Sequence, residues 1–117
     1  METALVKIGR EELWTKIQTG AHFVLVDAFS PISYAGSHLP GAINIPPASV
    51  DERAPRRIPD RDAEIVVYCA SVDCDSSHIV AEKLLALGYR NVRHYAEGKK
   101  DWVDAGLPLE GGRVKRV

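Results

Sequence analysis

Short apolar runs alternate along this chain with stretches of helical periodicity. The two clearest runs, residues 23–26 and 65–68, are rich in β-branched side chains and have the length of strands that are buried on both faces. Weaker strand patterns occupy residues 91–95 and 42–45, and residues 5–8 could add a strand at an edge. The apolar pattern therefore predicts about five strands in a mainly parallel sheet.

Between the strands, the spacing of apolar residues predicts four helices, over residues 11–19, 31–36, 77–87 and 99–105. The second helix begins at a Ser-Pro pair, in which serine caps the helix and proline takes its first position. Strands that alternate with helices are typical of an α/β domain, here with helices on both faces of the sheet.

Two stretches break this alternation. Residues 51–62 mix acidic and basic side chains and contain two prolines, so we expect a surface excursion there. Residues 109–117 are expected to form a loose tail, whose basic end is solvated. Residues 1–117 have the length of one domain, and its core is predicted over about residues 8–108.

Composition and charge exclude several classes of protein. Hydrophobic residues make up 45% of the chain and charged residues 26%, which is ordinary for a globular domain and unlike a disordered or collagen-like chain. With 15 Lys and Arg against 16 Asp and Glu, the net charge of -1 gives no field that attracts nucleic acid or anionic lipid. No apolar run could span a membrane, and the first residues lack the form of a signal peptide. We therefore expect a cytoplasmic protein with neither a nucleic-acid nor a membrane partner, and the sequence leaves its oligomeric state open.

Candidate chemistry follows the two clearest strands. Asp27 comes directly after the first and Cys69 directly after the second, and ligands of open α/β sheets bind beyond the carboxyl ends of the strands. The segment after Cys69 runs into the best helix, whose N-terminal amides and dipole would stabilise a thiolate. Position alone leaves two alternatives for Cys69 about even, a nucleophile or a buried structural cysteine.

A wider pattern separates these alternatives. The first half of the chain contains Val-Leu-Val-Asp at 24–27 and His-Leu-Pro-Gly-Ala-Ile-Asn-Ile-Pro at 38–46. The second half contains Ile-Val-Val-Tyr-Cys at 65–69, then Gly-Tyr at 88–89, and a closing segment at 98–108. In this order and spacing, the motifs resemble the rhodanese-like domain family over nearly the whole chain.

The resemblance implies a small α/β domain with a five-stranded sheet and the activity of a sulfurtransferase. Cys69 matches the catalytic cysteine, which takes sulfane sulfur from a small donor as a persulfide and passes it to a thiol or protein-thiol acceptor. Asp27 matches an acid that supports the active-site region. No cofactor or metal is implied. The loop expected to bind substrate comprises Ala70, Ser71, Val72, Asp73, Asp75 and Ser76.

The sequence departs from the family pattern at the expected active site. The loop after the cysteine is about two residues longer than usual, lacks Arg and Lys, and carries Asp73 and Asp75. Phe29 stands where the family often has arginine, and Glu97-Gly98 replaces a pair of glycines. Each change removes positive charge or adds negative charge, which raises a thiol pKa and disfavours an anionic donor. Thiosulfate is therefore an uncertain substrate.

A second cysteine, Cys74, follows Cys69 by five residues. The intervening residues could curl enough to bring the two Cα atoms within the roughly 4.4–6.8 Å that a disulfide requires. Cys74 would then be a resolving cysteine, which attacks a persulfide or sulfenate on Cys69 and releases the product. The alternative is a loop residue without a partner. Ser76 or Ser77 is expected to cap the helix that follows.

Histidines near the loop allow a metal site as an alternative interpretation. Cys69, Cys74 and His78 could be three ligands of a soft metal ion, but no fourth ligand is evident. An exposed histidine in the first helical turn is the favoured interpretation of His78. His38 is expected to be structural in its turn, and His94 carries no signal of a site.

Three classes of function remain. The favoured one is a sulfurtransferase that carries sulfur on Cys69. A thiol-redox or metalloid-handling module is the second, although the loop contains no arginine to hold an oxyanion. A non-catalytic binding or regulatory domain is the third, and the cysteine at the strand end weighs against it.

Overall fold

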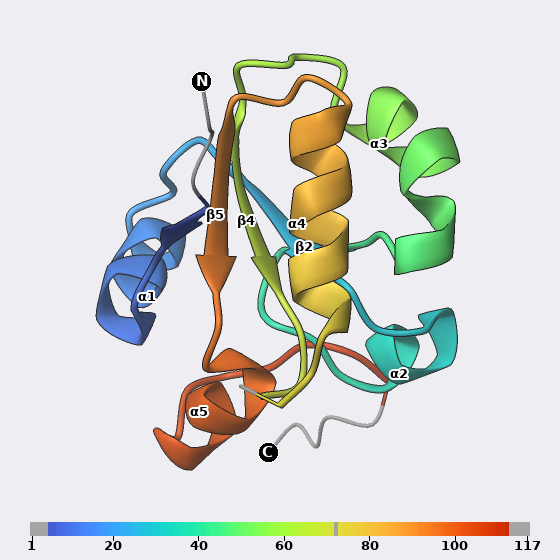
Figure 1. Cartoon of the computed structure of the whole chain (residues 1–117). Helices are drawn as coiled ribbons and strands as arrows, with labels where there is room; N and C mark the ends of the chain where they lie inside the picture. Colours follow the sequence, from blue (N-terminus) through green and yellow to red (C-terminus); the bar gives the residue numbers. More distant parts are fainter. Residues whose placement is uncertain (1–4, 72, 113–117) are drawn as a thin grey trace.

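The fold is a five-stranded parallel sheet with helices on both faces (Figure 1), seen in a computed structural model that describes residues 5–71 and 73–112. The strand order is β1-β5-β4-β2-β3, and every strand pair is parallel. The strands are β1 (Val6–Lys7), β2 (Val24–Asp27), β3 (Ile43–Asn44), β4 (Glu64–Tyr68) and β5 (Asn91–Tyr95). The helices are α1 (Arg10–Gln18), α2 (Pro31–Gly36), α3 (Val50–Arg57), α4 (Ser76–Ala86) and α5 (Gly98–Asp104), with a 3-10 turn at Pro47–Ser49. The predicted α/β class and strand number are confirmed.

The core has two layers because neighbouring residues of a strand point to opposite faces. Val26 and Val67 belong to the layer under α3 and α4, together with the apolar side of α4. Leu25 and Val66 belong to the layer on the other face, which α1 and α5 cover with Leu13 and the fully buried Trp102 (Figure 1). No helix in the described ranges has the length and apolar character needed to cross a membrane.

The register of the central strands places the two candidate residues at one end of the sheet. Asp27 pairs with Tyr68, the residue before Cys69, and the Ala28 N–H donates to the Tyr68 carbonyl at 3.0 Å. Both strands are parallel, so their carboxyl ends meet at the same edge. The predicted proximity of the Asp27 and Cys69 strand ends is confirmed.

The expected surface excursion over residues 51–62 is wrong in its first half, where the chain forms α3. Val50, Ala54 and Ile58 recur every four residues and are buried against the α4 layer. The charged side chains between them face outward and mask this apolar stripe in the sequence. Pro55 is tolerated inside the helix, which ends soon after at Arg57.

The tail also begins later than predicted. Glu110 and His38 exchange two backbone hydrogen bonds, of 2.8 and 2.9 Å, and the Gly112 N–H donates to the Ala35 carbonyl at 2.9 Å. Residues 109–112 therefore pack on α2 and its following turn, and they are not loose. Residues 113–117 of the predicted tail lie outside the described residues.

Candidate active site

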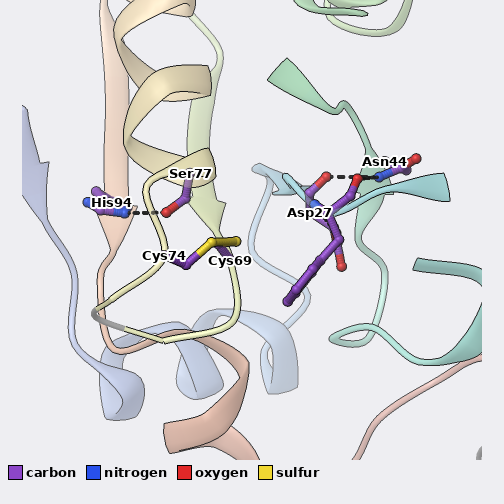
Figure 2. Close-up of a disulfide and its surroundings, with 7 residues drawn as sticks. Asp27, Asn44, Cys69, Cys74, Ser77 and His94 are labelled. Atoms are coloured by element: carbon purple, nitrogen blue, oxygen red, sulfur yellow. Dashed lines mark hydrogen bonds between the residues drawn. A yellow bond between two sulfur atoms is a disulfide. The ribbon is translucent and has the colours of Figure 1, made fainter. Parts of the chain in front are cut away.

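Cys69 lies at the carboxyl end of β4 and is joined to Cys74 by a disulfide (Figure 2). The two Cα atoms are 6.2 Å apart, inside the range predicted from the sequence. Cys69 is 2% exposed, whereas Cys74 is only partly buried. Cys74 is therefore not a loop residue without a partner, and it is the half of the pair that solvent reaches.

The start of α5 packs directly on the backbone that follows Cys69. The Lys99 N–H donates to the Cys69 carbonyl and the Lys100 N–H to the Ala70 carbonyl, both at 2.8 Å. Gly98 has φ +70°, and a Cβ there would lie 2.6 Å from the Cys69 carbonyl oxygen. Only glycine fits this approach, which accounts for the one glycine that the chain keeps at this position.

Asp27 holds the ends of β2 and β4 together from inside the core. Its buried carboxylate accepts hydrogen bonds from the Phe29 N–H at 2.8 Å and the Tyr68 hydroxyl at 2.6 Å. The Tyr68 hydroxyl in turn accepts from the Leu39 N–H at 2.9 Å. Burial raises the pKa of Asp27, and the hydrogen bonds from Tyr68 and Phe29 oppose that rise. Asn44 also donates to the Asp27 carbonyl (Figure 2), so the acid is positioned as a support of the site region.

A positive charge that the sequence analysis missed lies beside the site. The Lys99 ammonium lies 5.5 Å from the centre of the Phe29 ring and donates to the Ser37 carbonyl at 3.0 Å and to the Ser37 hydroxyl. Its charge also lowers the pKa of Asp27. The ring of Phe29, the residue that stands where the family often has arginine, thus has the Lys99 ammonium of α5 over it. The loop after Cys69 has no lysine or arginine of its own among its described residues, and this cation comes from α5 instead.

The predicted substrate loop is only partly brought together. Ser71 and Asp73 line a hollow of about 350 Å³, which they share with four charged residues at and before α5. Asp75 is exposed, while Ala70 and Ser76 are partly buried and flank the cysteines in sequence. Three of the α5-side residues are acidic, namely Glu97, Asp101 and Asp104, and the fourth is Lys100. Val72, the remaining predicted loop residue, lies outside the described residues.

Ser77 does not cap α4, and neither does Ser76. The cap position is Asp75, which makes no side-chain capping bond, and the buried Ser77 is the second residue of the helix. The Ser77 hydroxyl instead lies 2.7 Å from His94 Nε2, beside the disulfide (Figure 2). His94 therefore belongs to the site region, contrary to the sequence interpretation. No local signal could have shown this, because the pair depends on how α4 crosses β5.

The metal interpretation does not match the contacts of its three candidate ligands. The sulfurs of Cys69 and Cys74 are bonded to each other, and His78 Nε2 pairs with Glu82 at 2.7 Å on the exposed side of α4. Within residues 5–71 and 73–112, no group of His, Cys, Asp and Glu is arranged to hold a metal ion.

Comparisons with known proteins agree with this geometry. The family model of the rhodanese-like domain matches residues 9–105. The thiosulfate sulfurtransferase GlpE of Haemophilus influenzae is 32% identical over 104 residues, which are 89% of this chain and 93% of the relative. The HTH-type transcriptional regulator Rv0324 of Mycobacterium tuberculosis is 35% identical over 105 residues. That match covers 90% of this chain but only 45% of the regulator, so the chain spans less than half of this relative.

Solved structures show the same architecture. The crystal structure of the BH2092 protein from Bacillus halodurans superposes with a TM-score of 0.85 at 25% identity. The match covers 92% of this chain and 78% of the solved one.

Proposed function

Because the chain belongs to the rhodanese-like domain family, we propose that it is a sulfurtransferase that carries sulfane sulfur as a persulfide on Cys69. The observation that carries this proposal is the pairing of Cys69, at the carboxyl end of β4, with a second cysteine in the following loop. Relatives named as thiosulfate sulfurtransferases support the general class of reaction.

In the first step, the reduced Cys69 thiolate attacks the outer sulfur of a donor persulfide, R–S–SH. A bond forms between Cys69 Sγ and that sulfur, the donor S–S bond breaks, and R–S⁻ leaves. Burial around Cys69 excludes water from the resulting persulfide, which shields it from side reactions.

In the second step, Cys74 or an external thiol removes the outer sulfur from the Cys69 persulfide. If Cys74 attacks Cys69 Sγ, the Cys69–Cys74 disulfide forms, the bond to the outer sulfur breaks, and that sulfur leaves as sulfide. The two cysteines supply the two electrons that reduce the sulfane sulfur. The disulfide form of the protein corresponds to the state after this step. Two external thiols then reopen it and leave as their own disulfide.

A donor of low charge suits the surroundings better than thiosulfate. Asp73 and Asp75 flank Cys74, and Glu97 shares the hollow beside the loop with Asp73. Two cations lie near these carboxylates, and both are engaged: the Lys99 ammonium is bonded to Ser37 and the Lys100 ammonium to Asp104. A dianion therefore meets net repulsion, whereas a thiol-bound persulfide does not.

The cytoplasmic location inferred from the sequence fits this cycle as part of the proposal. Disulfides in reducing compartments are usually transient and catalytic or redox-sensing, because cellular thiols reopen them. The same thiols would return Cys69 and Cys74 to the reduced state after each turnover.

Intact mass tests the proposal. The reduced, desalted protein is incubated with a persulfide donor or with thiosulfate, and its mass is measured under non-reducing conditions. In the Cys74→Ser variant, where no internal resolution is possible, we expect a gain of one sulfur atom. The wild type should release sulfide and form the disulfide instead. A Cys69→Ser control should do neither, and an unmodified Cys74→Ser protein would contradict sulfur transfer.

The disulfide itself favours a second candidate, a thiol-redox module. Such a protein would close the Cys69–Cys74 disulfide on mild oxidation without ever accepting sulfur. The same mass experiment separates the two, because a redox module would lose two hydrogens with peroxide and gain no sulfur from any donor.

A further inference from the structure

A polar pair beside the disulfide, a buried serine and a partly buried histidine, has no part in the steps above. Ser77, on the first turn of α4, is 2% exposed, and its hydroxyl lies 2.7 Å from Nε2 of His94 on β5. Figure 2 shows the Ser77 hydroxyl on the α4 side of the two sulfurs, with His94 on the side of Ser77 away from them. Asp27 and Asn44, two further buried polar residues at this end of the sheet, lie on the opposite side of the disulfide.

The pair is placed to serve Cys74 in particular. Cys74 directly precedes the cap residue Asp75, Ser77 is the second residue of α4, and Figure 2 draws the Ser77 side chain next to that of Cys74. A serine hydroxyl has one donor proton and two acceptor lone pairs. It can therefore donate to an imidazole nitrogen and accept a thiol proton at the same time.

Cys74 needs such help because of its neighbours. Asp73 and Asp75 flank it in sequence, and nearby negative charge favours the protonated thiol over the thiolate. Only the thiolate can attack Cys69. Asp27 is not placed to serve as this base, since it lies on the other side of the disulfide from Ser77 (Figure 2) and its carboxylate is bonded to Phe29 and Tyr68.

We propose that Ser77 and His94 form a proton relay that activates Cys74 for the closure of the Cys69–Cys74 disulfide. As Cys74 Sγ attacks Cys69 Sγ, the Cys74 proton passes to Ser77 Oγ and the Ser77 proton passes to His94 Nε2. The new S–S bond forms, the bond from Cys69 to its outer sulfur breaks, and the departing sulfide takes up the proton that His94 holds. In this relay Ser77 takes the proton of the reacting thiol, and His94 is a positioning residue that acts through Ser77.

The surroundings keep His94 ready to accept a proton. Burial lowers its pKa, and the electrostatic influence of His78 on α4 and of Lys7 on β1 lowers it further. Glu97, which follows β5, opposes this shift. The imidazole is consequently neutral at physiological pH, and its Nε2 is an acceptor when Nδ1 carries the proton.

The relay rests on the proposed function only in that sulfur transfer gives the disulfide closure a role. Its test therefore measures the closure itself, without any sulfur transfer. The reduced protein is mixed with one equivalent of dithiobis(nitrobenzoate), whose coloured thiolate is followed by stopped flow. The first phase reports attack by Cys69, and the second reports closure by Cys74. Acid quenching between the phases, followed by peptide mapping, verifies that the mixed disulfide is on Cys69.

For the wild type, the second-phase rate should be nearly flat from about pH 7 to pH 8, because the relay removes the proton. In His94→Gln and in Ser77→Ala, it should be about tenfold slower at neutral pH, and should climb with pH until it meets the wild-type rate where the thiol ionises by itself. This convergence would not follow from a merely structural defect. His22→Gln, at an exposed histidine, is the control and should match the wild type.

A second-phase pH profile that neither variant changes would overturn the relay, and so would a first mixed disulfide on Cys74. Either result leaves the mass experiment on sulfur loading untouched. Conversely, a protein that never accepts sulfur but shows the predicted profiles would refute the sulfurtransferase function and keep the relay.

Discussion

The hydroxyl of Tyr68, the residue before Cys69, donates a 2.6 Å hydrogen bond to the buried carboxylate of Asp27. The same hydroxyl accepts from the Leu39 N–H, within the turn that follows α2. One side chain of β4 thus joins two other segments at the carboxyl end of the sheet. The position of Cys69 depends on this connection as well as on the strand pairing.

Removal of this hydroxyl should be costly. Tyr68→Phe leaves a buried carboxylate oxygen and a backbone N–H without partners, and should lower the free energy of unfolding by about 2–3 kcal/mol. Urea denaturation measures the effect. Tyr89→Phe is the control, because its hydroxyl donates to the Ile58 carbonyl and accepts from Arg61, which is partly exposed and can turn to water, so the loss should be only about 1 kcal/mol. Equal losses in the two variants would contradict the connecting role of Tyr68.

Gly98 should accept a side chain much less readily than Gly106 does. In Gly98→Ala, the new Cβ would collide with the Cys69 carbonyl, and the alanine backbone would have to keep a positive φ. We therefore expect the free energy of unfolding to fall by about 3 kcal/mol or more, and Cys69 to react more slowly. Gly106 has φ +74° and open space around it, so Gly106→Ala should cost only about 1–2 kcal/mol. Thermal unfolding and thiol alkylation rates provide the two measurements. If Gly98→Ala is destabilised but Cys69 reacts at an unchanged rate, the close packing of α5 on the Cys69 carbonyl does not control the reactivity of Cys69.

The two reduced cysteines should differ in reactivity. Cys69 lies at the base of the loop, directly after β4 and without a carboxylate beside it in sequence, whereas the carboxylates beside Cys74 keep that thiol protonated. Substoichiometric iodoacetamide near neutral pH should therefore label Cys69 first, as read by peptide mapping. An Asp73→Asn, Asp75→Asn double variant should narrow the difference. Preferential labelling of Cys74 in the wild type would reverse the assigned roles.

Thiosulfate should be a poor donor, and electrostatics should be the reason. The Asp73→Asn, Asp75→Asn double variant should raise thiosulfate turnover several-fold, and added salt should help the wild type by screening its carboxylates. Lys99→Gln should have the opposite effect, because it removes the cation beside Phe29. Persulfide donors should respond little to any of these changes. Fast thiosulfate turnover by the wild type at low salt would show that the acidic residues do not control donor choice.

His94 should make stability depend on pH. Its pKa is lowered in the folded protein, so below the unfolded value of 6.5 the unfolded chain binds more protons than the folded one. The contribution of neutral His94 to the free energy of unfolding is fully present above pH 6.5 and is lost as the pH falls from there toward the lower pKa of the folded state. Urea denaturation at several pH values should show this loss, and His94→Gln should reduce the slope while His22→Gln leaves it unchanged. Identical slopes in all three proteins would mean that His94 titrates normally.

The sequence predicts the central part of this fold well. The apolar runs at 23–26 and 65–68 contain no charged side chains, so the strands that form there, and the shared edge of Asp27 and Cys69, could be inferred. Helix α3 could not, because its three buried positions are spread among charges and prolines that outweigh them locally.

The site was harder to predict because two of its contacts join distant segments. Ser77 and His94 meet only through the packing of α4 on β5, and Lys99 reaches Phe29 only through the close approach of α5. Neither contact has a spacing signal in the sequence. The Cys69–Cys74 pair was within reach of inference because both residues belong to one short loop.

The backbone pairing of Glu110 with His38 has a practical consequence for any surface-based measurement. The strands are parallel, so the first described residue, Leu5, lies at the amino edge of the sheet, while Glu110 is fastened at the carboxyl edge beside α2. A linker that immobilises the protein near Leu5 would present the disulfide loop to the bulk solution, whereas one near Glu110 would turn it toward the support. Sensor experiments with thiol partners should accordingly use the first arrangement.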